Sequence, residues 1–102
     1  MQRVSKVIPD IEFIKKITRE NRDYDYKCAL KKLEKMFFDG VSDQAAKGHT
    51  YFEARFPSVE YSIGLDLAID KLKHYYIENG YTVEVERRHE NNTISRVKIR
   101  WD

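Results

Sequence analysis

The spacing of apolar residues changes twice along this chain of 102 residues, at Gly48 and again at Gly80. Before Gly48 the apolar residues recur at steps of three and four, which is the period of a helix with one buried side. From residue 50 to 56 they alternate, and alternation returns after Gly80, which is the period of a strand with one buried face. The chain must therefore combine helices with a sheet that has one apolar side.

The N-terminal part of the chain predicts two helices. The first begins near Pro9, has Ile11, Ile14 and Ile17 along one side, and ends around Asn21. Residues 21–23 supply turn and N-cap chemistry, and a longer helix follows over residues 26–45. Gly40 interrupts the pattern of this second helix, so we expect either a continuous helix with a kink or a break into two.

The rest of the chain predicts a strand over residues 50–56, a helix ending before Gly80, and strands over 81–86 and 96–101 joined by a hairpin turn around 89–93. The order is then α-α-β-α-β-β. Because the helix between the first two strands is long enough for a crossover, those strands are expected to be parallel, in a three-stranded mixed sheet. The expected inner face comprises Phe52, Ala54, Phe56, Tyr81, Val83, Val85, Val97, Ile99 and Trp101. The fold class is therefore α+β, as one domain over residues 1–102 with two layers, in which the helices cover one face of the sheet.

Cysteine content and hydropathy indicate where such a chain works. A single cysteine, Cys28, cannot form an internal disulfide, which favours a reducing compartment. Cys28 lies beside Ala29 and Leu30, so we expect a buried structural thiol. No segment has the apolar length of a signal peptide or of a membrane span. The cytoplasm is the expected location, without a membrane partner.

The residue types needed for catalysis or metal binding do not recur at the necessary spacings. His49, His74 and His89 have no metal-ligand spacing, and the four glycines are too isolated to form a phosphate-binding loop. Asp66 and Asp70 lie one helical turn apart, but a solvated pattern of surface charges explains them. We expect no enzyme activity, no cofactor and no metal site.

The expected outer face of the sheet is the first candidate binding surface. Tyrosine is common in protein interfaces because its rigid ring gives contact area at little entropic cost. On this face Tyr51 is expected beside Arg55, Arg96, Lys98 and Arg100. These five residues form the predicted partner-binding surface, although base stacking on the tyrosine is an alternative use of the same groups.

The N-terminal helices offer a second candidate surface. Residues 1–36 hold ten Lys or Arg against six acids, although the whole chain has a formal charge of only +2. Lys15, Lys16, Arg19, Lys27 and Lys31 could line a phosphate-binding groove in a nucleic acid complex. The same residues could equally be the solvated sides of two amphipathic helices, because acids such as Glu12 and Glu20 lie among them.

The C-terminal region has a recurring pattern, which includes the junction at 45–50, the helix end and strand at 79–85, and the last strand at 97–101. Over about the last 60 residues this pattern resembles that of many small uncharacterised proteins encoded by bacteriophages. It implies a short, non-enzymatic accessory protein that binds and inhibits a host protein, or that binds a small signal molecule, in the bacterial cytoplasm. A nucleic-acid-binding module and a virion or scaffolding component are the alternatives.

Overall fold

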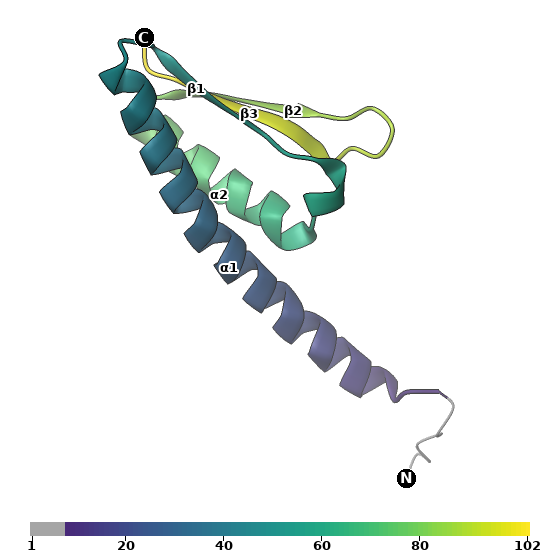
Figure 1. Ribbon diagram of the computed structural model, residues 1–102. Helices are drawn as coiled ribbons and strands as arrows, with labels where there is room; N and C mark the ends of the chain where they lie inside the picture. Colours follow the sequence, from purple (N-terminus) through teal and green to yellow (C-terminus); the bar gives the residue numbers. More distant parts are fainter. Residues whose placement is uncertain (1–7) are drawn as a thin grey trace.

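A computed structural model describes residues 8–102 (Figure 1). Its elements are helix α1 (Ile11–Ala46), strand β1 (Tyr51–Arg55), a short 3-10 turn (Ser58–Glu60), helix α2 (Ile63–Glu78) and strands β2 (Thr82–Arg87) and β3 (Ile94–Arg100). The predicted α+β class is confirmed. The last helix and all three strands lie close to their predicted positions.

One long helix replaces the two that the sequence predicted before Gly48. The expected turn at 21–23 is wrong, because its polar side chains act within α1: the Asn21 amide donates to the Ile17 carbonyl at 2.9 Å, and Asp23 pairs with Lys27 at 2.9 Å. The helix also continues without a break through Gly40. A Cβ at this position would overlap the ring of Phe52, so the glycine provides space for a strand residue.

The sheet is antiparallel, and the mixed sheet predicted from the sequence is wrong. The strand order is β1-β3-β2, and both outer strands pair antiparallel with β3. The first two strands therefore share a direction, as predicted, but they do not pair with each other. The last strand turns back in the hairpin and occupies the central position, where Ile94, Val97 and Ile99 become fully buried.

Figure 1 shows both helices on the same side of the sheet. The inner-face residues predicted from alternation are buried or partly buried there, from Phe52 in β1 to Trp101 after β3. The helices supply the opposing apolar residues Leu33, Phe37 and Val41 from α1 and Ala68, Ile69 and Leu72 from α2. In addition, Phe37 lies edge-on to the rings of Phe52 and Tyr76, at centroid distances of 6.1 and 6.2 Å.

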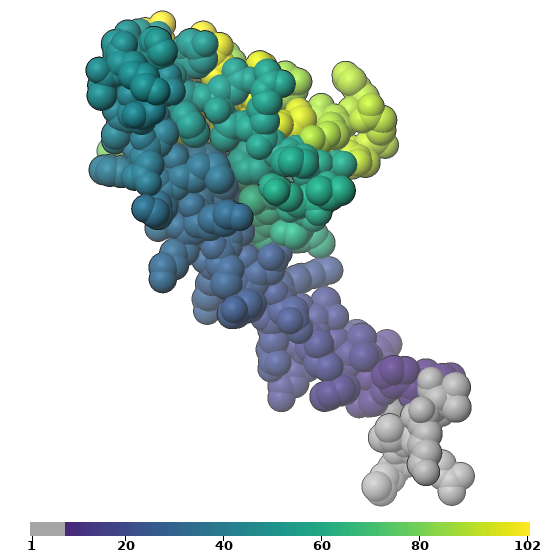
Figure 2. Space-filling view, viewed as in Figure 1, coloured from purple at the N-terminus to yellow at the C-terminus, as the bar shows by residue number. Residues whose placement is uncertain are grey.

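The first part of α1 does not reach this core. Every residue from 11 to 24, called the arm from here on, is exposed, and Asp25 is the first residue of the helix that is partly buried. Figure 2 shows the arm extending beyond the rest of the molecule. Ile11, Ile14 and Ile17 therefore face solvent in this structure.

The two helices meet closely at Gly64, in the first turn of α2. A Cβ at Gly64 would lie 2.7 Å from the backbone nitrogen of Tyr26 and 2.8 Å from the carbonyl carbon of Asp25. The Asp25 carboxylate also accepts the Gly64 backbone N–H at 3.2 Å. Ser62 caps the same helix by accepting the Leu65 backbone N–H at 3.1 Å.

We predict that Gly64→Ala lowers the free energy of unfolding by about 1–3 kcal/mol, because the added methyl group forces two helix backbones apart. Helix propensity alone would make the alanine variant more stable than the wild type, by about 1 kcal/mol. The loss of stability that we expect is therefore opposite to the effect of helix propensity. Urea unfolding measures the change. Leu67→Ala, at an exposed position of the same helix, is the control and should change stability by less than about 0.5 kcal/mol. An unchanged or more stable Gly64→Ala variant contradicts this packing.

Candidate functional site

The outer face of the sheet carries polar and charged side chains in three rows across the strands. In the order β1, β3, β2, these rows are Tyr51–Arg100–Thr82, Glu53–Lys98–Glu84 and Arg55–Arg96–Glu86. Both helices lie on the opposite side of the sheet (Figure 1). These nine residues, seven of them charged, are called the outer face from here on.

Ion pairs hold most of these charged groups in place. Arg96 in the central strand lies 2.9 Å from Glu86 and 3.6 Å from Glu53, and Arg100 lies 3.2 Å from Glu84. Arg55 reaches the same Glu53 at 3.2 Å, although its own side chain is largely exposed. Arg96 and Arg100 are therefore held by carboxylates on neighbouring strands, whereas Arg55 pairs within β1, and exposed pairs of this kind stabilise a sheet only modestly.

Lys98 makes a different contact. Its ammonium lies over the ring of Tyr51, 4.6 Å from the ring centroid, which is a cation–π geometry. Tyr51 stands on β1, at the edge of the sheet, and its ring is exposed. The pair thus presents a rigid aromatic surface with a positive charge held against it.

The structure brings together all five residues of the first candidate surface. Tyr51, Arg55, Arg96, Lys98 and Arg100 share the outer face, because residues two apart on a strand point the same way and the register aligns the three strands. The carboxylates of Glu53, Glu84 and Glu86 lie among them and neutralise much of their charge.

The second candidate surface is more dispersed. Lys15, Lys16 and Arg19 lie on the exposed arm of α1, whereas Lys27 and Lys31 follow where the helix begins to pack. At about 100° per residue, Lys27 and Lys31 lie roughly 120° and 160° around the helix from Lys15. Lys27 also pairs with Asp23. The five residues therefore do not form one continuous stripe.

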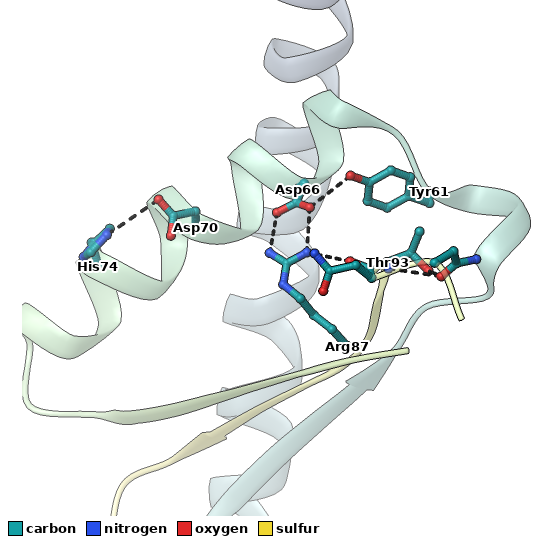
Figure 3. Close-up of polar contacts among 8 residues, drawn as sticks. Tyr61, Asp66, Asp70, His74, Arg87 and Thr93 are labelled. Atoms are coloured by element: carbon teal, nitrogen blue, oxygen red, sulfur yellow. Dashed lines mark hydrogen bonds and ion pairs between the residues drawn. The ribbon is translucent and has the colours of Figure 1, made fainter. Parts of the chain in front are cut away.

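Asp66 is the centre of a polar cluster that the sequence did not predict (Figure 3). Its carboxylate accepts two hydrogen bonds from the Arg87 guanidinium, at 2.8 and 2.9 Å, and one from the Tyr61 hydroxyl at 3.1 Å. Arg87 also donates to the Asn92 carbonyl at 3.0 Å. The cluster ties α2 to the β2–β3 hairpin, and the solvated charge pattern expected for Asp66 is wrong.

These contacts shift the pKa values of Asp66 and Tyr61. Hydrogen bonding from Arg87 holds the pKa of Asp66 below its usual value. Partial burial, followed by the hydrogen bond to Asp66, raises the pKa of the Tyr61 hydroxyl. Both shifts favour an ionised carboxylate beside a protonated phenol. The hydrogen-bonding groups of the cluster therefore satisfy one another and tie α2 to the hairpin.

The remaining candidate groups lie apart. Asp70 faces His74 at 3.6 Å on the exposed side of α2 (Figure 3), and His49 lies 2.5 Å from the Gln44 side chain at the end of α1. In residues 8–102 no three His, Cys, Asp or Glu side chains are grouped closely enough to hold a metal ion. Cys28 is exposed, so the expectation of a buried thiol is wrong: its neighbours Ala29 and Leu30 turn towards the core while Cys28 turns away.

Comparisons with known proteins found no protein-family model, no curated protein and no solved structure that matches this chain. Across residues 8–102, neither helix has the apolar length that crossing a bilayer requires.

We predict that Asp66→Asn lowers the free energy of unfolding at neutral pH by about 1–2 kcal/mol, because the charged hydrogen bonds to Arg87 are lost. The folded pKa of Asp66 is depressed, so its contribution is complete above the unfolded value of about 3.9 and is lost as pH falls through the folded pKa. Urea unfolding at several pH values should show the wild type and the variant converging in acid. Asp70→Asn, at a more exposed carboxylate, should have the smaller effect.

Proposed function

We propose that this protein acts by binding another protein one for one, as a bacteriophage accessory protein in the host cytoplasm, with no catalytic step of its own. The outer face of the sheet is the proposed contact surface. One observation carries this proposal: Tyr51, Arg55, Arg96, Lys98 and Arg100 stand together on the side of the sheet opposite the helices.

The chemistry of the outer face suits a protein partner better than a polyanion. Three glutamates stand among its four cations, so the net charge of the surface is small and phosphate groups would meet carboxylates. Arginines held by neighbouring carboxylates lose little further side-chain entropy when a partner binds. The Tyr51 ring beneath the Lys98 ammonium adds an aromatic surface, and tyrosine is one of the residue types enriched among those that contribute strongly to protein interfaces.

We predict that Tyr51→Ala combined with Lys98→Ala weakens binding of the partner by about tenfold or more, because the pair provides the aromatic anchor of the surface. The tagged wild type is first used to capture a stoichiometric protein from bacterial lysate, and calorimetry with the purified partner then compares the variants. Circular dichroism checks that each variant is folded.

The matched control is Tyr75→Ala combined with Lys71→Ala. These residues form a second lysine–tyrosine pair, on α2, with the ammonium 5.8 Å from the ring centroid. The control should bind like the wild type. If it loses affinity as much as the outer-face variant does, or if the outer-face variant binds normally, the outer face is not the contact surface.

A nucleic-acid-binding role is the second proposal, and the exposure of the arm favours it. Lys15, Lys16 and Arg19 project from a part of α1 that is surrounded by solvent, so phosphates could approach them without displacing other contacts. The arm also carries Glu12, Glu20 and Asp23, which reduce its positive potential. This proposal therefore ranks below the first.

For this second role we predict affinity for mixed-sequence DNA or RNA that falls steeply as salt is added, because bound counterions are released on binding. Replacing Lys15, Lys16 and Arg19 together by alanine should abolish it. Fluorescence anisotropy over a range of salt concentrations measures both effects. Absence of binding at the lowest salt concentration contradicts the role.

A further inference from the structure

The arm of α1 presents apolar side chains to solvent. Ile11, Phe13, Ile14 and Ile17 are 61%, 58%, 43% and 37% exposed, and Tyr24 at the end of the arm is exposed as well. Large exposed apolar surfaces mark interaction sites, since covering them is favourable. A helical segment of about 14 residues without tertiary contacts is also marginal by itself in water. Both considerations indicate a surface that a partner covers.

Two of these apolar residues, Ile14 and Ile17, begin a stripe with a seven-residue repeat that runs along α1. Steps of three and four residues connect the members of this stripe, which are Ile14, Ile17, Asn21, Tyr24, Cys28 and Lys31. At about 100° per residue, the stripe lies on the side of α1 opposite Tyr26, Leu33 and Phe37, which pack against the core. It therefore stays accessible along the arm and along the following turns of α1. This spacing is that of a coiled-coil seam, in which single polar residues such as Asn or Lys help to set the register.

A shallow groove adjoins the stripe where the arm meets the body of the molecule. Tyr24 and Cys28 from α1 and Ile63 from the start of α2 line this groove. Ile63 is 47% exposed, so its side chain is available to a partner. The groove offers an apolar contact of the kind that the isoleucines of an arm require.

We propose that a second copy of this chain covers the stripe, with residues 11–34 of the two copies packed as an antiparallel pair. The two-fold axis passes between Arg22 and Asp23. Three contacts then form, each of them twice. Ile17 packs against Cys28 of the second copy, and Asn21 packs against Tyr24. Ile14 packs against the aliphatic part of Lys31. The isoleucines of each arm thereby reach the groove beside Ile63 of the other copy. This self-association goes beyond the proposed function, because it uses a different surface.

Charge complementarity favours the antiparallel orientation. In an antiparallel pair, Glu20 lies opposite Lys27 of the second copy, and this contact occurs twice. The residues that flank the stripe then bring no like charges together. A parallel pair in register would place Glu20 opposite Asp25 and Lys27 opposite Lys32, each twice, which gives four like-charge contacts. It would also pair Asn21 with its equivalent, a favourable contact in parallel pairs, but this single contact is outweighed by the four repulsive ones.

The geometry of the fold permits this pairing. At 1.5 Å per residue, the shared segment is about 36 Å long, which is more than three heptads. Each arm then lies along residues 21–34 of the other copy, where α1 begins to pack against its own body. Figure 1 shows the sheet on one side of the helices, and the stripe lies on the side of α1 opposite Leu33 and Phe37, which pack in the core, so the outer face stays uncovered. A dimer formed in this way could still bind one partner on each outer face.

The first experiment measures mass against concentration for the purified full chain by sedimentation, with reducing agent present to keep Cys28 as a thiol. We expect a monomer–dimer equilibrium for the wild type and a monomer at all concentrations for Ile14→Lys combined with Ile17→Lys. The matched control is Lys15→Ala combined with Arg19→Ala, on the other side of the same arm, and it should dimerise. Since arm residues lie outside the core, circular dichroism should report folded protein for each.

The second experiment tests the orientation. Glu20→Lys and Lys27→Glu should each weaken the dimer, by about tenfold, because each turns two attractive contacts into repulsive ones. The double variant should restore it. In a parallel pair each single substitution would instead strengthen the dimer, because it removes two like-charge contacts. A wild type that remains monomeric, a dimer that tolerates Ile14→Lys with Ile17→Lys, or single charge variants that bind more tightly would each overturn the proposal. None of these readouts involves the outer face.

Discussion

Burial of the inner face of the sheet beneath the two helices is the interaction on which the rest of the structure depends. The central strand β3 contributes Val97 and Ile99, both almost completely inaccessible, and Phe37 of α1 packs opposite them within the same core. A three-stranded sheet has too little surface to be stable without such a cover. Because one face is committed to the helices, the polar residues that alternate with the core residues must all appear on the other face.

Two polar contacts determine how the covering helices are placed. The close approach at Gly64, where Asp25 accepts a backbone hydrogen bond, sets where α1 crosses α2. The bidentate contact between Asp66 and Arg87 then attaches α2 to the hairpin. Together they leave the first turns of α1 without a neighbour. The arm is thus exposed because of where the helices cross. It carries one candidate contact surface at a distance from the other, which is the outer face.

Local pattern accounted for much of the fold and for the first candidate surface. Alternation alone placed Tyr51, Lys98 and Arg100 on one face, because side chains of a strand point to opposite sides with a period of two. Local pattern could not predict contacts between residues far apart in the sequence. Arg87 and Asp66 are 21 residues apart, and only the turn of the chain between them brings the guanidinium to the carboxylate. The turn predicted at 21–23 failed because Asn21 and Asp23 also satisfy their polar groups inside a helix.

The sequence by itself determined the secondary structure after Gly48 and the polarity of each sheet face, since these depend on residue types at short spacing. Only the tertiary structure decided that β3 lies between β1 and β2, that α1 is one helix with an exposed arm, and that Cys28 faces solvent. The reason is physical. Strand order and helix crossing depend on which distant surfaces fit together, and the free energy of that fit belongs to pairs of segments rather than to either segment alone.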